Sequence, residues 1–268
     1  MRDFRLWHTT TAQVSPPPLV WEALQLVRGA TVADVGCGSG AYGFLLRAGW
    51  GHTESWLQQG ITRPGALHGL DNSPHATKLA ERHRIYDRLH LCPATALPLD
   101  DGAVDTAVCT ETLEHLYAPD VVPAVRELAR VATQRVIVTT PVPEYIVNLP
   151  ELLTEIQEAR QDPDPLPYEE YAVLESALHK VWLSTERLAA AGFETDGEVV
   201  RGSRVYHADP ATMDPEALGD VPGIPVPPPA APDPDEESDW RARYVQLLTS
   251  VREMADAVPG LAAAGAGR

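Results

Sequence analysis

The sequence predicts an α/β fold, in which a doubly wound, mostly parallel sheet carries helices on both faces. Short β-branched runs alternate with amphipathic segments along most of the chain, and this alternation is typical of parallel strands joined by crossover helices. The runs end at glycine, proline or a capping serine, which mark the boundaries of elements. The chain has 268 residues, 44% of them hydrophobic, which suffices for one such domain with additions.

The first half of the chain opens with a helix and then alternates strands and helices. Apolar residues at helical spacing predict the leading helix over Leu19–Val27. A second helix is predicted to begin at Ser73 and Pro74 and to reach about Arg84, because serine caps free N–H groups and proline suits a first turn. The other predicted elements are strands at Thr31–Gly36, Leu67–Asp71 and Leu89–Cys92 and a helix at Ala41–Ala48.

The second half continues the alternation as far as Tyr206 and so predicts one domain over residues 1–208. Its predicted elements are a strand at Val104–Thr110, a helix at Asp120–Val131, a strand at Arg135–Thr140, a helix at Ser184–Ala191 closed by Gly192, and one or two strands over Gly197–Tyr206.

Four segments do not fit the alternation. Gly49–Gly65 is predicted to be an inserted loop, and residues 141–179 a helical lid insertion. Asp209–Asp239 is rich in proline, alanine and aspartate and predicts an extended linker. Residues 240–268 are predicted to form a C-terminal helix and a low-complexity tail.

The formal net charge of −17 disfavours nucleic acid as a partner, because phosphate binding needs a basic surface. The acidity is also consistent with solubility alone. The three cysteines, Cys37, Cys92 and Cys109, have neither disulfide nor metal-site spacing, which favours a reducing, cytoplasmic location. No apolar run is long enough for a membrane helix, and no secretory signal is evident at the N-terminus.

A glycine-rich turn follows the first predicted strand, at Gly36, Gly38 and Gly40. Glycines there let the backbone bend sharply and let a ligand lie against the main chain. The spacing G-x-G-x-G differs from the dinucleotide pattern G-x-G-x-x-G, which makes a dehydrogenase a distant alternative. A turn with a purely structural role is the other alternative.

The segment Asp-Val-Gly-Cys-Gly-Ser-Gly (34–40) resembles the first motif of class I S-adenosylmethionine (SAM)-dependent methyltransferases. The resemblance implies a Rossmann-like methyltransferase fold with a seven-stranded sheet, and SAM as the cofactor with S-adenosylhomocysteine (SAH) as the product. It further implies that Asp34 lies near the methionine end of SAM. The loop residues expected against the cofactor are Gly36, Cys37, Gly38, Ser39 and Gly40.

Asp71 ends the second predicted strand, where a carboxylate can accept hydrogen bonds from both ribose hydroxyls. The same family places an acid there, so the resemblance assigns Asp71, with Asn72 beside it, to the cofactor; a simple helix cap is the alternative. Cys92–Pro98 resembles the adenine segment of the family, but Pro93 stands where an aspartate often binds the adenine amino group. The backbone of Ala94 and Thr95 is expected to meet the adenine edge instead.

Thr110 and Glu111 follow the fourth predicted strand and are expected to line the cofactor pocket. If the segment is helical, Glu111, Glu114 and His115 share one face and have the chemistry of a divalent-cation site. A Glu-x-x-Glu-His cluster with a distant histidine, here His179, also resembles the metal site of methyltransferases that modify the 2′-oxygen at small-RNA 3′ ends. The same Glu-x-x-Glu-His pattern occurs in metal-free methyltransferases of small molecules, and no metal is assigned to the site.

The sequence thus predicts a SAM-dependent methyltransferase that acts on an oxygen or nitrogen of a small-molecule acceptor. His115 and His179 are the predicted general bases, since imidazole titrates near neutral pH; structural histidines are the alternative. Two other functions stay open: a metal-assisted RNA 3′-end 2′-O-methyltransferase and a non-catalytic partner protein with the same fold. The sequence gives no prediction of oligomeric state.

Overall fold

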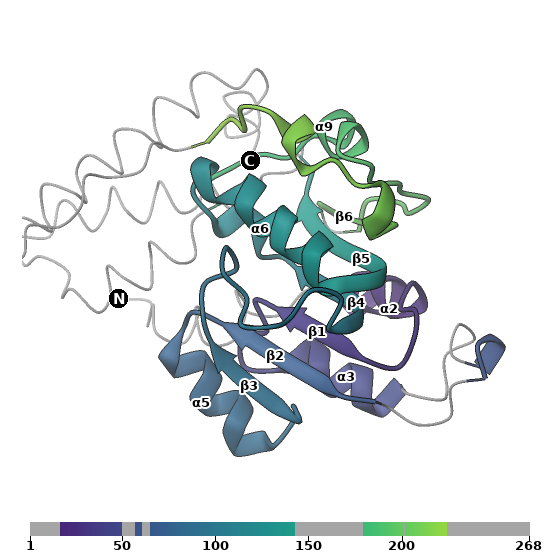
Figure 1. Cartoon of the computed structure of the whole chain (residues 1–268), viewed down its shortest axis with the longest axis vertical. Coiled ribbons are helices and arrows are strands. Elements are labelled where there is room, and N and C mark those ends of the chain that lie inside the picture. The colour runs from purple at the N-terminus through teal and green to yellow at the C-terminus, as the bar shows by residue number, and fades with distance from the viewer. Residues whose placement is uncertain (1–16, 50–56, 61–64, 143–178, 201, 224–268) are drawn as a thin grey trace, which may run out of the picture.

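The computed structural model of the chain describes residues 17–49, 57–60, 65–142, 179–200 and 202–223. One six-stranded sheet organises them, in the order β3-β2-β1-β4-β5-β6 (Figure 1). Its strands are β1 (Val32–Val35), β2 (Leu67–Asp71), β3 (Arg88–Leu91), β4 (Val104–Thr110), β5 (Ala132–Pro141) and β6 (Ser203–Ala208). All neighbouring pairs are parallel except β5 and β6, which are antiparallel. The predicted mostly parallel α/β fold is confirmed.

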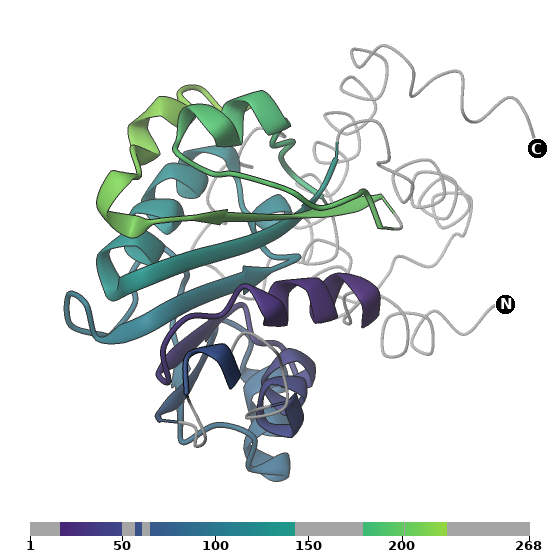
Figure 2. The ribbon, with the colours of Figure 1, turned by 90° about the vertical axis from the view of Figure 1, so that its right-hand side faces the viewer.

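Helices cover both faces of the sheet, and Figure 2 shows α2 and α6 on opposite sides of it. The helices are α2 (Pro17–Gln25), α3 (Ala41–Gly49), α5 (Pro74–His83), α6 (Ala118–Val131) and α9 (Thr185–Ala190), with 3-10 helices η1 (Leu113–His115), η3 (Pro210–Thr212) and η4 (Pro215–Leu218). One core cluster joins the sheet to α6 and α9, and a second joins it to α2 and α3. Because helices cover both faces of the sheet, β1 and β4 are buried along almost their whole length.

Local chemistry fixes the start and the end of α5. The Ser73 hydroxyl accepts a hydrogen bond from the Ala76 N–H at 3.3 Å, and Pro74 occupies the first turn. Arg84 ends the helix in the left-handed conformation, with φ of 50°. The predicted start and end of this helix are therefore confirmed.

The strand order reverses at β1, which lies between β2 and β4. At such a switch point the loops after adjacent strands diverge and leave a crevice for a ligand. Three predicted site segments lie there, because Gly36–Gly40 follows β1, Asp71 ends β2 and Thr110 ends β4. The topology therefore gathers residues that are up to 74 positions apart in the sequence.

The sheet has six strands in the part of the chain that the structure describes, not the seven that the family resemblance implies. Residues 194–200 pair with β6 through the isolated bridges Glu194↔His207 and Val200↔Ser203, and the Thr195 hydroxyl donates a hydrogen bond to the Val205 carbonyl at 2.7 Å. Between those bridges lie Asp196, Gly197 and Glu198, which are poor strand formers. Residues 194–200 thus form an irregular arm beside β6 and not a seventh strand.

The predicted linker also differs from the structure over its first residues, 209–223. These residues form η3 and η4, and the side chains of Leu218 and Val221 are buried in the core. Asp209 accepts a hydrogen bond from the Ala211 N–H at 3.0 Å and so starts η3. Proline-rich composition predicted an extended chain, but two apolar anchors fold it onto the domain. The rest of the linker, the lid over 143–178 and the C-terminal segment lie outside the described residues.

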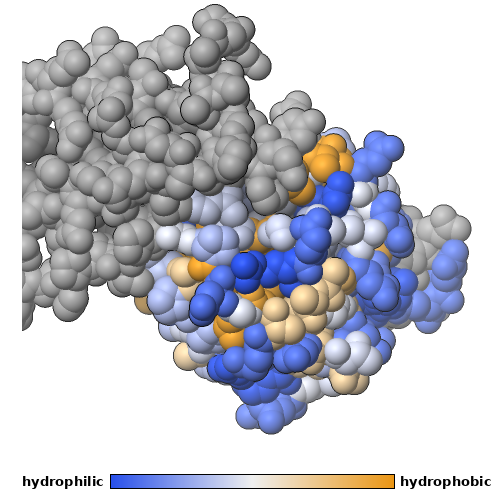
Figure 3. Space-filling model, turned by 90° about the horizontal axis from the view of Figure 1, so that it is seen from above, coloured by the Kyte–Doolittle hydropathy of each residue, from blue (hydrophilic) through white to orange (hydrophobic). Residues whose placement is uncertain are grey.

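The surface in Figure 3 is mixed, with hydrophilic residues surrounding smaller hydrophobic areas. Large apolar side chains that are more than one third exposed are few among the described residues: Trp21, Phe44, Leu45, Leu57 and Leu91. None of the helices described has the length and apolar content needed to cross a bilayer.

Candidate functional site

The glycine turn after β1 presents bare main chain at its centre. Gly36, Gly38 and Gly40 all have positive φ, of 74°, 53° and 95°, a region that favours glycine. A Cβ on Gly36 would meet the Thr112 side chain at 2.1 Å, whereas a Cβ on Gly38 would meet nothing within 4 Å. Gly36 therefore packs against the protein, and Gly38 borders open space that a ligand can fill.

Asp71 contacts this turn directly. Its Oδ2 accepts a hydrogen bond from the Gly38 N–H at 2.8 Å, and its Oδ1 accepts one from the Ser73 N–H at 2.7 Å. Each carboxylate oxygen keeps a further lone pair, and the side chain is only half-buried. Asp71 can thus bind ribose hydroxyls while it holds the glycine turn, and Asn72 beside it is exposed.

Asp34 lies beneath the turn and is fully buried. The Tyr86 hydroxyl donates a hydrogen bond to its Oδ2 at 2.6 Å, while its Oδ1 has no hydrogen-bond partner. Burial raises the pKa of Asp34 to about 7, against the lowering effect of the Tyr86 hydrogen bond. The side chain of Asp34 therefore lies under the turn and has no exposed surface.

Two other predicted loop residues differ in their exposure. Cys37 is buried, and its pKa is raised by burial and by the nearby carboxylate of Asp34, so it is an inert thiol. Ser39 is half-exposed beside Gly38 and has the position of a cofactor contact.

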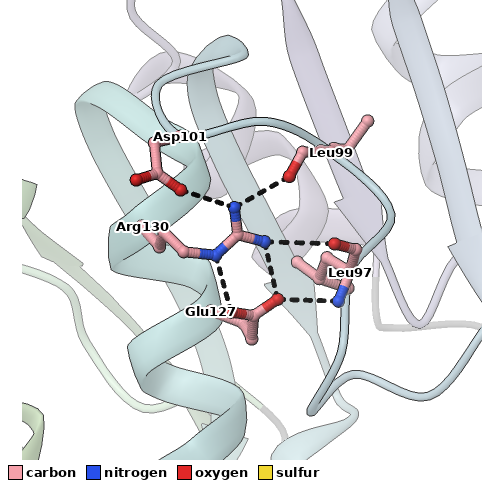
Figure 4. A network of polar contacts seen from close by, with 5 residues as sticks. All are labelled: Leu97, Leu99, Asp101, Glu127 and Arg130. Atoms are coloured by element: carbon pink, nitrogen blue, oxygen red, sulfur yellow. Dashed lines mark hydrogen bonds and ion pairs between the residues drawn. The ribbon is translucent and has the colours of Figure 1, made fainter.

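The predicted adenine segment lies next to Asp71, because the Cys92 N–H donates to the Asp71 carbonyl at 2.9 Å. Ala94 and Thr95 are half-buried there. A network from α6 holds the continuation of this segment (Figure 4). The Arg130 guanidinium donates to the carbonyls of Leu97 and Leu99 at 3.0 and 2.8 Å, and Glu127 accepts from the Leu97 N–H at 2.7 Å.

The segment after β4 forms only a 3-10 turn over Leu113–His115, so Glu111 precedes the helix instead of sharing its face. Glu111 has a positive φ of 46°. Its Oε2 accepts a hydrogen bond from the Ser203 hydroxyl at 2.8 Å, and its N–H donates to Thr139 Oγ1 at 2.9 Å. Thr110, the last residue of β4, is almost fully buried.

Glu114 is 1% exposed, and within the described part of the chain neither of its carboxylate oxygens has a hydrogen-bond partner. Burial, and secondarily the charge of Glu111, raises the pKa of Glu114 well above its usual value. An ionised carboxylate without a partner is costly in such a place. Glu114 therefore needs either a proton or a cation.

His179 joins this cluster from a distant part of the chain. One ligand atom each of Glu114, His115 and His179 lies within 4.8 Å of the others, and the two imidazole rings meet edge to face at a centroid distance of 5.0 Å. Backbone bonds from Lys180 and Val181 to the Glu114 carbonyl hold the segment in place. Burial, with the charge of Lys180, lowers the pKa of His179 to about 4. The described cluster has the donor set of a divalent-cation site, one carboxylate and two imidazoles.

Sequence reasoning missed Tyr86 and the Glu127–Arg130 pair. The signal for Tyr86 lies in two glycines outside the motif: a Cβ on Gly43 or Gly69 would approach the Tyr86 ring to 2.5 or 2.6 Å. The signal for Arg130 is the pair Glu127 and Arg130 at i, i+3 on a helix. Neither pattern identifies its partner loop without the structure.

Comparison with known proteins gives the class of this domain. Residues 33–139 match the family model described as "Methyltransferase domain". The mouse protein tRNA (carboxymethyluridine(34)-5-O)-methyltransferase ALKBH8 is 30% identical over 125 residues, 46% of this chain and 16% of that protein. The chain thus spans about a sixth of the length of this relative.

Two solved structures of methyltransferases are similar at low identity. Magnesium protoporphyrin IX methyltransferase from Synechocystis PCC 6803, with bound SAH, is 18% identical and aligns with a TM-score of 0.43 over 77% of this chain and 84% of its own. A SAM-dependent methyltransferase from Thermotoga maritima is 17% identical, with a TM-score of 0.46 over 77% and 94% of the two chains.

Residues 33–139 match a methyltransferase domain model and contain the glycine motif, so this part of the chain is a methyltransferase domain. The prediction of a methyltransferase is confirmed, and SAM is the cofactor that the glycine motif implies. The bare main chain at Gly38, next to the Asp71 carboxylate, fits a nucleoside cofactor at this place.

Proposed function

We propose that the protein transfers the methyl group of SAM to an oxygen of a small-molecule acceptor. The observation that carries this proposal is the cluster of buried Glu114 with the half-buried His115 and His179, at the same end of the sheet as the cofactor turn. Thr112 packs against Gly36 and so joins the two regions. A cofactor on the turn and an acceptor at the cluster would therefore be neighbours.

Methyl transfer needs little covalent participation by the protein. The acceptor oxygen attacks the methyl carbon in line, the C–S bond breaks as the O–C bond forms, and SAH leaves with both electrons of the broken bond. The acceptor proton must go to a base. His179 is available for this role because its imidazole is unprotonated at neutral pH, but the same lowering of its pKa to about 4 makes it a weaker base, and His115 lies beside it.

A second candidate function is metal-assisted methylation of the 2′-oxygen at an RNA 3′ end. The unpartnered carboxylate of Glu114 beside two imidazoles favours it, and Glu111 is a near neighbour of this set. A divalent cation there would hold and polarise the acceptor oxygen. The match to a tRNA methyltransferase is compatible with an RNA acceptor. The net charge of −17 opposes it.

Metal content separates the two functions. The purified protein and its Glu114→Gln variant are analysed for divalent metal after dialysis, and both are assayed with labelled SAM on fractionated small molecules and RNA. No metal, with label in the small-molecule fraction, supports the first function. Stoichiometric metal that is lost in Glu114→Gln, with label at RNA 3′ ends, supports the second. A protein that binds SAM and labels neither fraction contradicts both and favours a non-catalytic role.

A further inference from the structure

Tyr86 occupies a slot that three glycines leave for it. Its ring would touch a Cβ placed on Gly43 at 2.5 Å, on Gly69 at 2.6 Å, or on Gly40 at 3.3 Å. These glycines come from α3, from β2 and from the cofactor turn. Any side chain at Gly43 or Gly69 would displace the ring, so the slot fixes where the hydroxyl of Tyr86 points.

The hydroxyl points at Asp34. It donates to Asp34 Oδ2 at 2.6 Å, inside the core and away from water. The second oxygen of Asp34 is buried and accepts no hydrogen bond of normal geometry from the residues that the structure describes, although the Gly43 N–H also lowers the pKa of this carboxyl slightly. A carboxylate in this state is poorly stabilised, and the Tyr86 hydroxyl is the side-chain donor that supports its charged form.

The electrostatic surroundings of Asp34 contain no compensating cation among the described residues. The titratable groups that interact with it are Tyr86 from the segment before β3, Tyr42 on α3, Cys37 in the turn, Asp71 on β2 and Cys109 on β4. All of them are neutral or negative at neutral pH. SAM carries positive charge on its sulfonium and on its ammonium group, so a bound cofactor would bring the missing cation close to this carboxylate.

We propose that Tyr86 is a positioning residue for cofactor binding: its hydroxyl keeps Asp34 as an oriented carboxylate beneath the glycine turn, where it attracts the cationic methionine part of SAM. This role rests on the SAM-binding function of the domain and not on the identity of the acceptor. Tyr86 itself need not touch the cofactor.

The test is the pH dependence of cofactor affinity in Tyr86→Phe, which keeps the ring in its slot and removes only the donor. Dissociation constants for SAM and for SAH are measured by calorimetry on the full chain between about pH 5.5 and about pH 9.5. The readout is the ratio of the variant Kd to the wild-type Kd, because the titration of the ligand's own amino group cancels in that ratio.

Removal of the donor raises the pKa of Asp34, so over a window of pH the variant carries a protonated Asp34 and the wild type an ionised one. The ratio is expected to be near one at the acidic end, to rise by up to about tenfold for each unit of pKa change, and to return towards one at the alkaline end. Asp34→Asn has no ionisable group at this position and should bind SAM with the weak affinity of the protonated state. At acidic pH the Kd of Asp34→Asn for SAM should therefore approach the Kd of Tyr86→Phe.

A ratio that stays constant with pH, at one or at any other value, would overturn the role of Tyr86, because a purely structural loss does not titrate. A wild-type protein that binds neither SAM nor SAH would instead overturn the cofactor-binding function itself. The two failures are therefore distinguishable in the same experiment.

Discussion

At the scale of single residues, the glycines of the turn differ clearly in what surrounds them. Gly36 has no room for a side chain, because the protein already fills the place of its Cβ. Gly38 borders open space beside Asp71. The sequence predicted both residues and Asp71, since each belongs to a local pattern. Tyr86 could not be predicted, because it lies 52 positions from Asp34 and fits against glycines in other elements.

Replacing Gly38 with alanine should weaken SAM binding beyond the cost of backbone strain. Gly60 is a matched control, because it also has positive φ and open space around its Cβ position. Both substitutions should lower the free energy of unfolding by about 1–2 kcal/mol, from left-handed backbone strain. Only Gly38→Ala should also raise the Kd for SAM in calorimetry. Equal Kd values for the two variants would show that no ligand lies at Gly38.

Asp34 should make the stability of the unliganded protein depend on pH. Its pKa is about 7 in the folded chain and 3.8 as the unperturbed value. Below pH 3.8 the folded and unfolded states are both protonated at Asp34, and its contribution to stability is fully present. As the pH rises towards 7 that contribution is lost, because the unfolded state ionises first.

Urea titrations of wild type and Asp34→Asn between about pH 5 and about pH 8 check this sign. The difference in the free energy of unfolding, variant minus wild type, should grow as the pH increases. Parallel curves for the two proteins would contradict the raised pKa of Asp34.

At the scale of elements, the sequence predicted the order and type of the helices and strands and placed the ends of β2 and β4 correctly. The prediction was wrong where tertiary contacts determine the local structure. The arm over residues 194–200 makes bridges but no strand, and residues 209–223 fold onto the core through Leu218 and Val221. Composition alone cannot show that two apolar side chains have a place to pack.

The contact between α6 and the segment after the adenine residues should affect both stability and cofactor affinity. Arg130→Met leaves the carbonyls of Leu97 and Leu99 without their donor, and we expect a loss of about 1–3 kcal/mol in the free energy of unfolding. The KM for SAM should rise while kcat at saturating SAM changes little.

Arg126→Met on the same helix is the control. Arg126 pairs with Glu216 on an exposed surface, and such pairs contribute about 0–1 kcal/mol. Both variants are compared by urea denaturation and by steady-state kinetics. Equal KM values for wild type and Arg130→Met would show that this network does not position the adenine segment.

The whole molecule carries a net charge of −17 on 268 residues. The net charge predicted that a polyanion is disfavoured as a partner. The predicted fold placed the expected cofactor residues at the carboxyl ends of parallel strands. The identity of the acceptor could not be predicted, because no local pattern shows which distant segments meet around the proposed site: Ser203 reaches Glu111, and His179 reaches Glu114, only through the fold.

Self-repulsion of this charge should make the protein more stable in salt. Raising the ionic strength from about 0.05 M to about 0.5 M shortens the screening length well below the size of the domain, so the free energy of unfolding should increase. Sodium chloride and potassium chloride should give the same gain at equal concentration, because screening depends on ionic strength. A loss of stability in both salts would contradict this expectation.

The hydrogen bond from Ser203 to Glu111 joins two residues that are far apart in the order of synthesis. The turn at Gly38 and the acid at Asp71 are present once the first five strands have been synthesised, whereas His179 and Ser203 follow later along the chain. A nascent chain that reaches only the end of β5 contains the predicted cofactor residues but neither His179 nor Ser203, so the proposed acceptor cluster is the last part of the site to be synthesised.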